Sequence, residues 1–293
     1  MKMKCPICKS LNQKNIWNDK IRDGKNQYSS KKILINLCIN CNVRYKASRT
    51  KKYLDNEVHR KRYEGEASIK KYQSFNKSRE LDKYKNFFKT INFKNKKVLE
   101  SNCGGGAVLQ KISKQAKIVA GIESSYYKEF LKKKNILYFS NFREIYKQKF
   151  KFDITISLGE LEHKYDPILF IKNIKNTLNK NGIIVIRVPN YDNIYRYTLG
   201  DFFLKDDYRT SHNFYFNESS LDYIFKKTGL KILKKLGLHE YSLNNFISYL
   251  KFKKRPQKKL LNLFETRDNN LFKKNVEKTL ISTSLLYILK KNV

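Results

Sequence analysis

The chain has 293 residues, and its 63 Lys and Arg against 26 Asp and Glu give a formal net charge of +37. Hydrophobic residues make up 40% and aromatic residues 14%, which is enough for a folded core and argues against a disordered chain. No segment approaches the ~20 consecutive apolar residues that span a bilayer, and residues 1–6 lack the apolar region of a secretory signal, so we expect a cytoplasmic protein without membrane insertion.

The positive charge has two possible explanations. A charge of this size attracts polyanions such as nucleic acid or an anionic membrane surface. However, Lys, Asn and Ile crowd every segment of the chain instead of forming one basic block, as an AT-rich coding sequence would produce. We favour compositional drift over a dedicated polyanion-binding role, and nucleic acid stays open as a second-choice partner.

Four of the five cysteines form two Cys-x-x-Cys pairs, Cys5 with Cys8 and Cys38 with Cys41. Each pair can place two thiolates on one side of a tight turn, and together they supply four sulfur ligands for tetrahedral Zn²⁺. A disulfide framework and a redox pair are the alternatives. The lack of an export signal argues against disulfides, and the predicted strand at 32–37 between the pairs favours metal. We expect a structural zinc ribbon over residues 1–50, because four cysteine ligands leave no open position for catalysis.

A helical connector is expected over residues 51–93. This stretch contains no Pro and a single Gly, and its apolar residues recur at roughly helical spacing.

Residues 97–109, KVLESNCGGGAVL, indicate a buried strand, a glycine turn and the start of a helix. This segment resembles the first motif of class I S-adenosylmethionine-dependent methyltransferases, in which an acidic strand-end residue precedes a G-x-G-x-G loop. Glycines let the backbone approach a ligand, and amides at the helix N-terminus face the ligand's polar end. Asn102 stands at the first glycine position. The turn is expected to survive, because Asn is the residue besides Gly that best tolerates positive φ.

Later segments match the same family in order. Residues 117–123 read as a second strand that ends in Glu123, whose carboxylate is expected to accept hydrogen bonds from ribose hydroxyls. A third strand at 136–139 precedes Asn141, which stands where the family often has an Asp near the adenine. Three more segments resemble the family's "FD…LEH…DP" loop, its "L-pG-G" turn with the fifth strand, and its "H-yF…sL…Gf" segment: residues 152–167, 178–190 and 212–230.

The alternation of strands and helices predicts an α/β fold with a Rossmann-like, doubly wound, mostly parallel sheet. The resemblance implies an antiparallel last strand, for which 284–289 is the natural candidate. We expect the methyltransferase domain to span 94–293, with a helical insertion at about 241–275.

The resemblance also implies a binding site for S-adenosylmethionine. Cys103 is expected to pack in the turn as a small residue and not to act as a nucleophile. The expected cofactor-binding residues are Glu100, Asn102, Cys103, Gly104, Gly106, Glu123, Asn141, Leu158 and Glu162.

Two of the four histidines, His163 and His212, follow predicted strands at the edge where open α/β sheets bind ligands. Either could deprotonate a hydroxyl, an amine or an activated carbon during methyl transfer. The alternative for each is that it orders a loop by hydrogen bonding, and for His163 this alternative is slightly favoured. An obligatory base need not exist, because the sulfonium of the cofactor is already activated.

The leading functional hypothesis is an S-adenosylmethionine-dependent methyltransferase acting on a small-molecule or sugar-like acceptor, similar to bacterial small-molecule and sugar methyltransferases. A zinc-ribbon-containing RNA methyltransferase is the alternative, because the positive charge would help RNA binding. A non-catalytic cofactor-binding relic is a third hypothesis, for which Asn102 and Asn141 are the only indications. Neither the acceptor atom nor the oligomeric state is indicated by the sequence.

Overall fold

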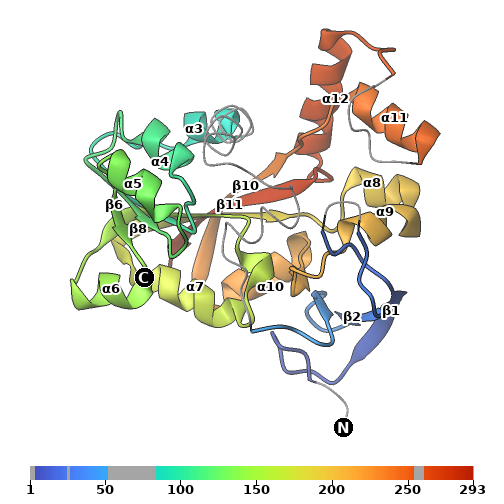
Figure 1. The fold of residues 1–293 in the computed structure, drawn as a ribbon, viewed down its shortest axis with the longest axis horizontal. Coiled ribbons are helices and arrows are strands. Elements are labelled where there is room, and N and C mark those ends of the chain that lie inside the picture. The colour runs from blue at the N-terminus through green and yellow to red at the C-terminus, as the bar shows by residue number, and fades with distance from the viewer. Residues whose placement is uncertain (1–3, 25–26, 52–83, 254–260, 293) are drawn as a thin grey trace.

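The computed structural model describes residues 4–24, 27–51, 84–253 and 261–292, which form a seven-stranded and a four-stranded sheet (Figure 1). The larger sheet has the strands β4 (Lys97–Ser101), β5 (Ile118–Ile122), β6 (Leu137–Phe139), β7 (Phe152–Leu158), β8 (Leu178–Pro189), β10 (Leu230–Leu238) and β11 (Ser284–Lys291). The smaller sheet has β1 (Gln13–Asp19), β2 (Ile33–Cys38), β3 (Arg44–Lys46) and β9 (Phe214–Tyr215). None of the helices in these ranges is long and apolar enough to cross a membrane.

The larger sheet has the order β10-β11-β8-β7-β4-β5-β6. Its ladders are parallel except for those of β11, which runs antiparallel to both β8 and β10. The predicted doubly wound, mostly parallel sheet is therefore confirmed, including the antiparallel strand expected at 284–289. The strand order reverses at β4, whose neighbours are β5 and β7, and open α/β sheets bind ligands at such a switch point.

Both faces of the sheet are buried, because successive apolar side chains of a strand point to opposite faces. In β8, Ile184, Ile186 and Val188 pack in one core cluster, whereas Val185 packs in another on the opposite face. The first cluster includes residues of α7 (Pro167–Asn176) and α10 (Glu218–Lys227), and the second includes residues of α3 (Lys85–Thr90) and α4 (Ala107–Ile112). Figure 1 shows these two pairs of helices on opposite sides of the sheet. The remaining helices are α5 (Lys128–Lys133), α6 (Phe142–Lys147), α8 (Ile194–Leu199), α9 (Asp201–Asp207), α11 (Leu243–Phe252) and α12 (Thr266–Lys278).

Three details refine the sequence predictions. Of the segment 178–190, expected to form a turn and the fifth strand, residues Leu178–Pro189 form one strand, β8, whose register with β7 shifts near its start: Phe152 pairs with Leu178 and Ile154 with Ile183. Of the connector expected over 51–93, residues 52–83 lie outside the described residues, and α3 is the described helix. The insertion expected at about 241–275 contains α11 and most of α12.

The smaller sheet joins the N-terminal segment to the rest of the chain. β1 and β2 form a hairpin between the two cysteine pairs, with Gln13 opposite Cys38, and β2 corresponds to the strand predicted at 32–37. β9 adds a fourth strand, since Arg44 and Tyr45 of β3 pair with Tyr215 and Phe214. The apolar cluster of this segment, which includes Val43, is continuous with that of the larger sheet.

Candidate functional site

The glycine turn after β4 lies at the switch point of the sheet. Asn102, Gly104 and Gly106 all have positive φ values, of 55°, 55° and 71°. The left-handed conformation expected of Asn102 is therefore present. The positive φ of Gly106 favours glycine, and a Cβ there would stand 2.6 Å from Leu131 Cδ2, so the end of that side chain would also have to shift. The turn leads directly into α4.

Glu123 follows β5 and is 2% exposed. Its Oε2 accepts a hydrogen bond from the Gly104 amide at 2.9 Å, and its Oε1 accepts one from the Ser125 amide at 2.8 Å. These bonds tie the end of β5 to the glycine turn. A carboxylate accepts about four hydrogen bonds, so both contacts are compatible with ribose hydroxyls as further donors.

The remaining residues around the turn are buried. Cys103 packs against Gly121, where a Cβ would meet its Sγ at 2.3 Å, and burial raises the pKa of this thiol well above its usual value. This is the environment of a packed residue and not of a thiolate nucleophile. Glu100 is 5% exposed in β4, and the buried Oγ of the adjacent Ser101 has no hydrogen-bond partner among the described residues. The sequence does not predict a role for Ser101, because a serine at a strand end carries no specific signal.

Asn141 is the N-cap of α6. Its Oδ1 accepts hydrogen bonds from the amides of Arg143 and Glu144 at 2.9 and 3.3 Å. The acceptor that the sequence offered to an adenine therefore caps a helix in this structure. Leu158 is half-buried at the end of β7. The cofactor-binding roles of both residues stay predictions.

Glu162 is buried beyond the end of β7, in the 3₁₀ turn Leu161–His163. Burial raises the pKa of Glu162 to about 7, although the positive charges of Arg187 and Arg209 act in the opposite direction. Its Oε2 has no hydrogen-bond partner among the described residues. A buried carboxylate oxygen without a protein partner is suited to a bound polar ligand.

His163 and His212 lie together. Their ring centroids are 4.8 Å apart and their planes are inclined by 86°. A carboxylate oxygen of Glu162 and one ring nitrogen of each histidine lie within 4.8 Å of one another. His163 Nδ1 is 2.9 Å from the carbonyl oxygen of Ser211, and burial lowers the pKa of His163 to about 4. Because a carbonyl only accepts, Nδ1 carries the proton of a neutral ring.

The four cysteines of the N-terminal pairs come together, with all Sγ atoms within 4.8 Å of one another. Cys5 and Cys41 Sγ are 3.6 Å apart, and Cys8 and Cys38 Sγ are 3.4 Å apart. Tetrahedral Zn²⁺ with Zn–S distances of about 2.3 Å requires sulfur atoms at this spacing. The hydrogen bond from Cys41 lowers the pKa of Cys5 to about 5, and burial raises the pKa of Cys38 to about 11. The cluster thus fits a structural zinc ion.

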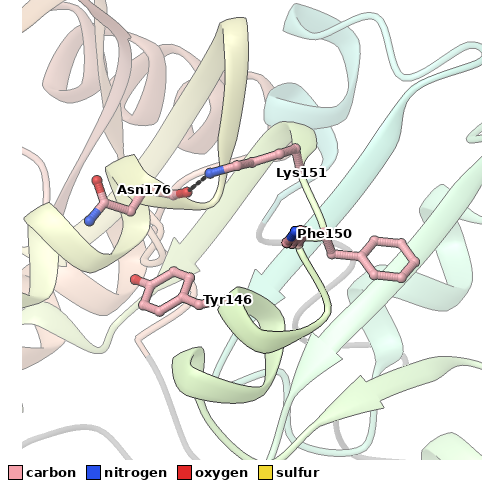
Figure 2. A pocket seen from close by; sticks show the side chains of 5 residues that line it. Tyr146, Phe150, Lys151 and Asn176 are labelled. Atoms are coloured by element: carbon pink, nitrogen blue, oxygen red, sulfur yellow. Dashed lines mark hydrogen bonds between the residues drawn. The ribbon is translucent and has the colours of Figure 1, made fainter.

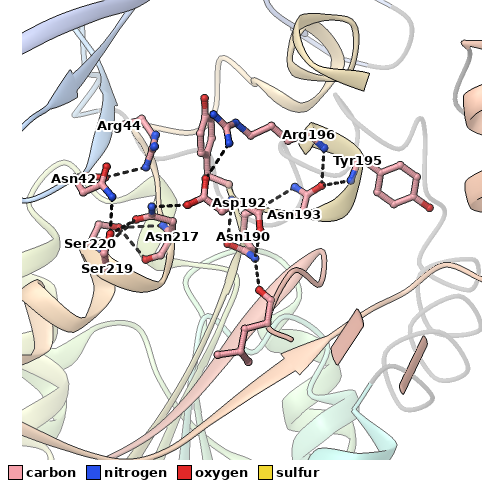
Figure 3. A network of polar contacts seen from close by, with 12 residues as sticks. Asn42, Arg44, Asn190, Asp192, Asn193, Tyr195, Arg196, Asn217, Ser219 and Ser220 are labelled. Atoms are coloured by element: carbon pink, nitrogen blue, oxygen red, sulfur yellow. Dashed lines mark hydrogen bonds and ion pairs between the residues drawn. The ribbon is translucent and has the colours of Figure 1, made fainter. Parts of the chain in front are cut away.

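A polar network connects this N-terminal ribbon to the segment after β8 (Figure 3). Asn42 donates to Ser219 Oγ at 2.6 Å, and the Arg44 guanidinium lies 4.1 Å from the ring centroid of Tyr191. Asp192 accepts from Asn217 Nδ2 at 2.7 Å and pairs with Arg196 at 3.2 Å. Tyr191 and Asp192 are thus part of the contact with the ribbon and α10.

Asn213 is the residue of this region that sequence reasoning missed. It is fully buried and bonds both to the ribbon and to the turn that carries His163. Its position next to His212 in the motif was the available signal.

A pocket of about 330 Å³ lies elsewhere, between the C-terminal end of α6 with the loop that follows it and the C-terminal end of α7 (Figure 2). Tyr146, Lys149, Phe150, Lys151 and Asn176 line it. Residues 149–151 precede β7 and Asn176 precedes β8, so this pocket is at the amino ends of the parallel strands. It is separate from the candidate site, which lies at their carboxyl ends.

Three comparisons relate the chain to known proteins. A family profile described as "Methyltransferase domain" matches residues 72–235. The ubiquinone biosynthesis O-methyltransferase of Pelagibacter ubique is 36% identical over 104 residues, which are 33% of this chain and 43% of that protein. The Coxiella burnetii protein of the same name is 28% identical over 168 residues, 53% of this chain and 72% of that protein. The chain thus spans less than half the length of the first relative.

Among solved structures, this chain is similar to a chain of the complex between the Haloferax volcanii Trm112 methyltransferase activator and a methyltransferase. The TM-score is 0.53 at 12% identity, over 76% of this chain and 93% of that chain. At this identity the likeness shows the fold alone.

Proposed function

The chain belongs to the methyltransferase-domain family, and from this membership we propose that it is an enzyme that transfers the methyl group of S-adenosylmethionine to a hydroxyl group of a small-molecule or sugar-like acceptor. The observation that carries the proposal is that His163, His212 and Glu162 lie together at the carboxyl edge of the sheet. They are next to the switch point at β4, where the glycine turn lies. The names of the curated relatives favour oxygen as the acceptor atom.

The residues of the switch point fit the cofactor. The turn at Asn102, Gly104 and Gly106 brings backbone close to the ligand, and Glu123 would hold its ribose hydroxyls. The buried Ser101 Oγ and Glu162 Oε2, which lack partners among the described residues, are available to its polar groups. When bound, S-adenosylmethionine supplies an activated methyl group on a sulfonium. Positioning an acceptor in line with that group provides much of the rate.

His212 would take the proton of the acceptor hydroxyl. His163 is held neutral by burial, and its Nδ1–H donates to Ser211, so it orders the loop beside His212. Glu162, with its pKa raised to about 7, can carry negative charge near neutral pH and would stabilise an imidazolium at His212. This assignment gives the two histidines different roles.

A radiolabel assay tests the proposal. Metal-loaded protein is incubated with methyl-labelled S-adenosylmethionine and a panel of phenols, catechols and nucleotide sugars. We expect label on a hydroxyl oxygen of one class. His212→Gln should lower kcat by about 10²–10⁴-fold, the usual contribution of a general base, with unchanged cofactor affinity. Label on nitrogen or carbon would contradict the acceptor assignment, and an unchanged kcat in His212→Gln would contradict the base.

RNA is the second candidate acceptor, because of the net charge of +37. Binding of total RNA should be weak at physiological salt if the acceptor is small. A steep loss of RNA affinity with rising salt, indicating many phosphate contacts, together with label on RNA would favour the alternative.

The four-cysteine cluster is proposed to hold a structural Zn²⁺ within a ribbon over residues 1–50, followed by the methyltransferase domain over 94–293. The proposal is supported by the sulfur spacing and by the hairpin between the two cysteine pairs. With four cysteine ligands the ion would have no open position for substrate.

A further inference from the structure

The segment that carries His212 lies between two parts of the N-terminal ribbon. On one side, the Arg22 amide donates to the Tyr208 carbonyl, and the Thr210 amide donates to the Arg22 carbonyl, both at 3.0 Å. On the other side, β3 pairs with β9, which begins two residues after His212. Lys46 Nζ also donates to the Thr210 carbonyl. Ribbon and acceptor site therefore share one continuous hydrogen-bonded structure.

Asn213 is the residue at which this structure meets the histidine pair. Its side-chain Oδ1 accepts from the Thr50 amide at 3.0 Å, and its Nδ2 donates to the carbonyls of Thr50 and His163 at 2.9 and 3.0 Å. Its backbone N–H donates to the Glu162 carbonyl at 2.8 Å, and its carbonyl accepts from the Lys46 amide at 3.1 Å. These five bonds join the end of the ribbon to the turn that carries Glu162 and His163.

The geometry leaves Asn213 little freedom. The side chain is fully buried, so water cannot replace a lost partner at low cost. A displacement of Thr50 or Lys46 would have to move Asn213, and with it the backbone on which His212 and His163 face each other. The ribbon in turn is held by the cysteine cluster, because Cys38 ends β2, which pairs with β3.

We propose that Asn213 is a positioning residue through which the four-cysteine ribbon fixes the His163–His212 pair, so that metal in the ribbon is required for an ordered acceptor site but not for binding of the cofactor. Its catalytic consequence rests on the proposed function. The coupling itself does not.

Two readouts test the coupling without an acceptor. The first is hydrogen exchange of residues 160–164 and 209–216. The second is the ¹⁵N spectrum of the imidazole rings, which is simple because the chain has four histidines. In the metal-loaded wild type, His163 should give the signature of the Nδ1–H tautomer, since Nδ1 faces the Ser211 carbonyl.

The variants are Asn213→Ala and Asn213→Asp, each compared with the metal-loaded wild type. Only the Ala variant opens a cavity, and only the Asp variant adds a buried carboxylate, whereas both lack the Nδ2 donors. An effect shared by both variants is therefore assigned to the lost donors. Ser219→Ala is the matched control, because it removes a contact between ribbon and α10 that does not pass through Asn213. Chelation of metal from the wild type gives the same readouts without a substitution, in case a variant does not fold.

We expect about tenfold faster exchange in both segments, and a mixture of His163 tautomers, for the Asn213 variants and for chelated wild type. Ser219→Ala should behave as wild type. With an identified acceptor, kcat should fall at least about tenfold while KM for S-adenosylmethionine stays constant. The coupling would be overturned if hydrogen exchange stayed at the wild-type rate and His163 kept its Nδ1–H tautomer. Either case suffices: this result after chelation, or this result in both Asn213 variants. If the coupling holds but the wild type transfers no methyl group, the proposed function fails and the coupling stands.

Discussion

The imidazole rings of His163 and His212 meet edge to face, with centroids 4.8 Å apart and planes inclined by 86°. His163 ends the turn after β7, and His212 precedes β9, which belongs to the ribbon sheet. The contact therefore joins the loop after β7 to the segment that the ribbon holds. Through this contact the ribbon is connected to the proposed acceptor site at the carboxyl edge of the larger sheet.

Glu123→Ala should weaken binding of S-adenosylmethionine by about 2 kcal/mol, roughly 30-fold, because a charge-assisted contact with the ribose is lost. Calorimetric titration measures the affinity. Glu129→Ala is the control, since Glu129 is a carboxylate on α5 that pairs only with Lys132 at the surface among the ion pairs described. Equal affinities of the two variants would remove Glu123 from the cofactor site.

Gly106→Ala should lower both stability and cofactor affinity. Its φ of +71° costs an L-residue about 1–2 kcal/mol, and the new Cβ would displace Leu131. Gly200→Ala separates these effects, because Gly200 also has positive φ (+53°) but no atom within 4 Å of the new Cβ. We expect thermal unfolding to occur at lower temperature in both variants and calorimetry to show weaker cofactor binding in Gly106→Ala alone. Unchanged affinity in Gly106→Ala would contradict the assignment of the turn.

The free energy of unfolding should depend on pH through Glu162, whose pKa is raised by burial to about 7 from an ordinary value of 4.5. Between pH 4.5 and 7 the native protein holds this proton and the unfolded chain does not, so the contribution to stability falls as pH rises. Glu162→Gln should therefore gain stability over the wild type progressively across this window, by about 3 kcal/mol above pH 7.

His239 acts in the opposite direction. Burial lowers its pKa to about 4, so between pH 4 and 6.5 the unfolded chain binds more protons and stability rises with pH. The pH dependence of the wild-type free energy of unfolding combines both contributions. The measurement is therefore the difference in the free energy of unfolding between Glu162→Gln and the wild type, obtained from urea unfolding at each pH. A difference that does not change with pH would show that Glu162 titrates at its ordinary pKa.

Removal of the metal should destabilise the apolar cluster that the ribbon shares with β8 and β11, and not the ribbon alone, because residues of all three pack together in it. Elemental analysis should find one zinc ion per chain. Cys38→Ser should lose it and unfold at lower temperature. Cys103→Ser is the matched control, since Cys103 packs on Gly121 outside the cluster and its loss should leave the zinc content unchanged. Full zinc content in Cys38→Ser would contradict the four-cysteine site.

Local patterns predicted much of this molecule. Three features follow from short segments of sequence, because each depends on the conformation of neighbouring residues. They are the turn with Asn102 and its glycines, the carboxylate of Glu123 after its strand, and the two Cys-x-x-Cys pairs. The pairing of β3 with β9 does not, because β9 is two residues long and its partner lies far away in the chain. The role of Asn213 depends on that pairing and was missed for the same reason. Asn141 shows the converse limit: the same oxygen that could face an adenine also suits a helix cap, and the structure shows the cap.

The proposed cofactor and acceptor sites are tested most directly by a crystal structure of the zinc-loaded protein with S-adenosylhomocysteine, the product of methyl transfer. We expect the adenosine to lie across the carboxyl ends of β4 and β5, with its ribose hydroxyls on Glu123 and its sulfur atom facing the His163–His212 pair. A product bound elsewhere, or one whose sulfur points away from both histidines, would contradict this expectation.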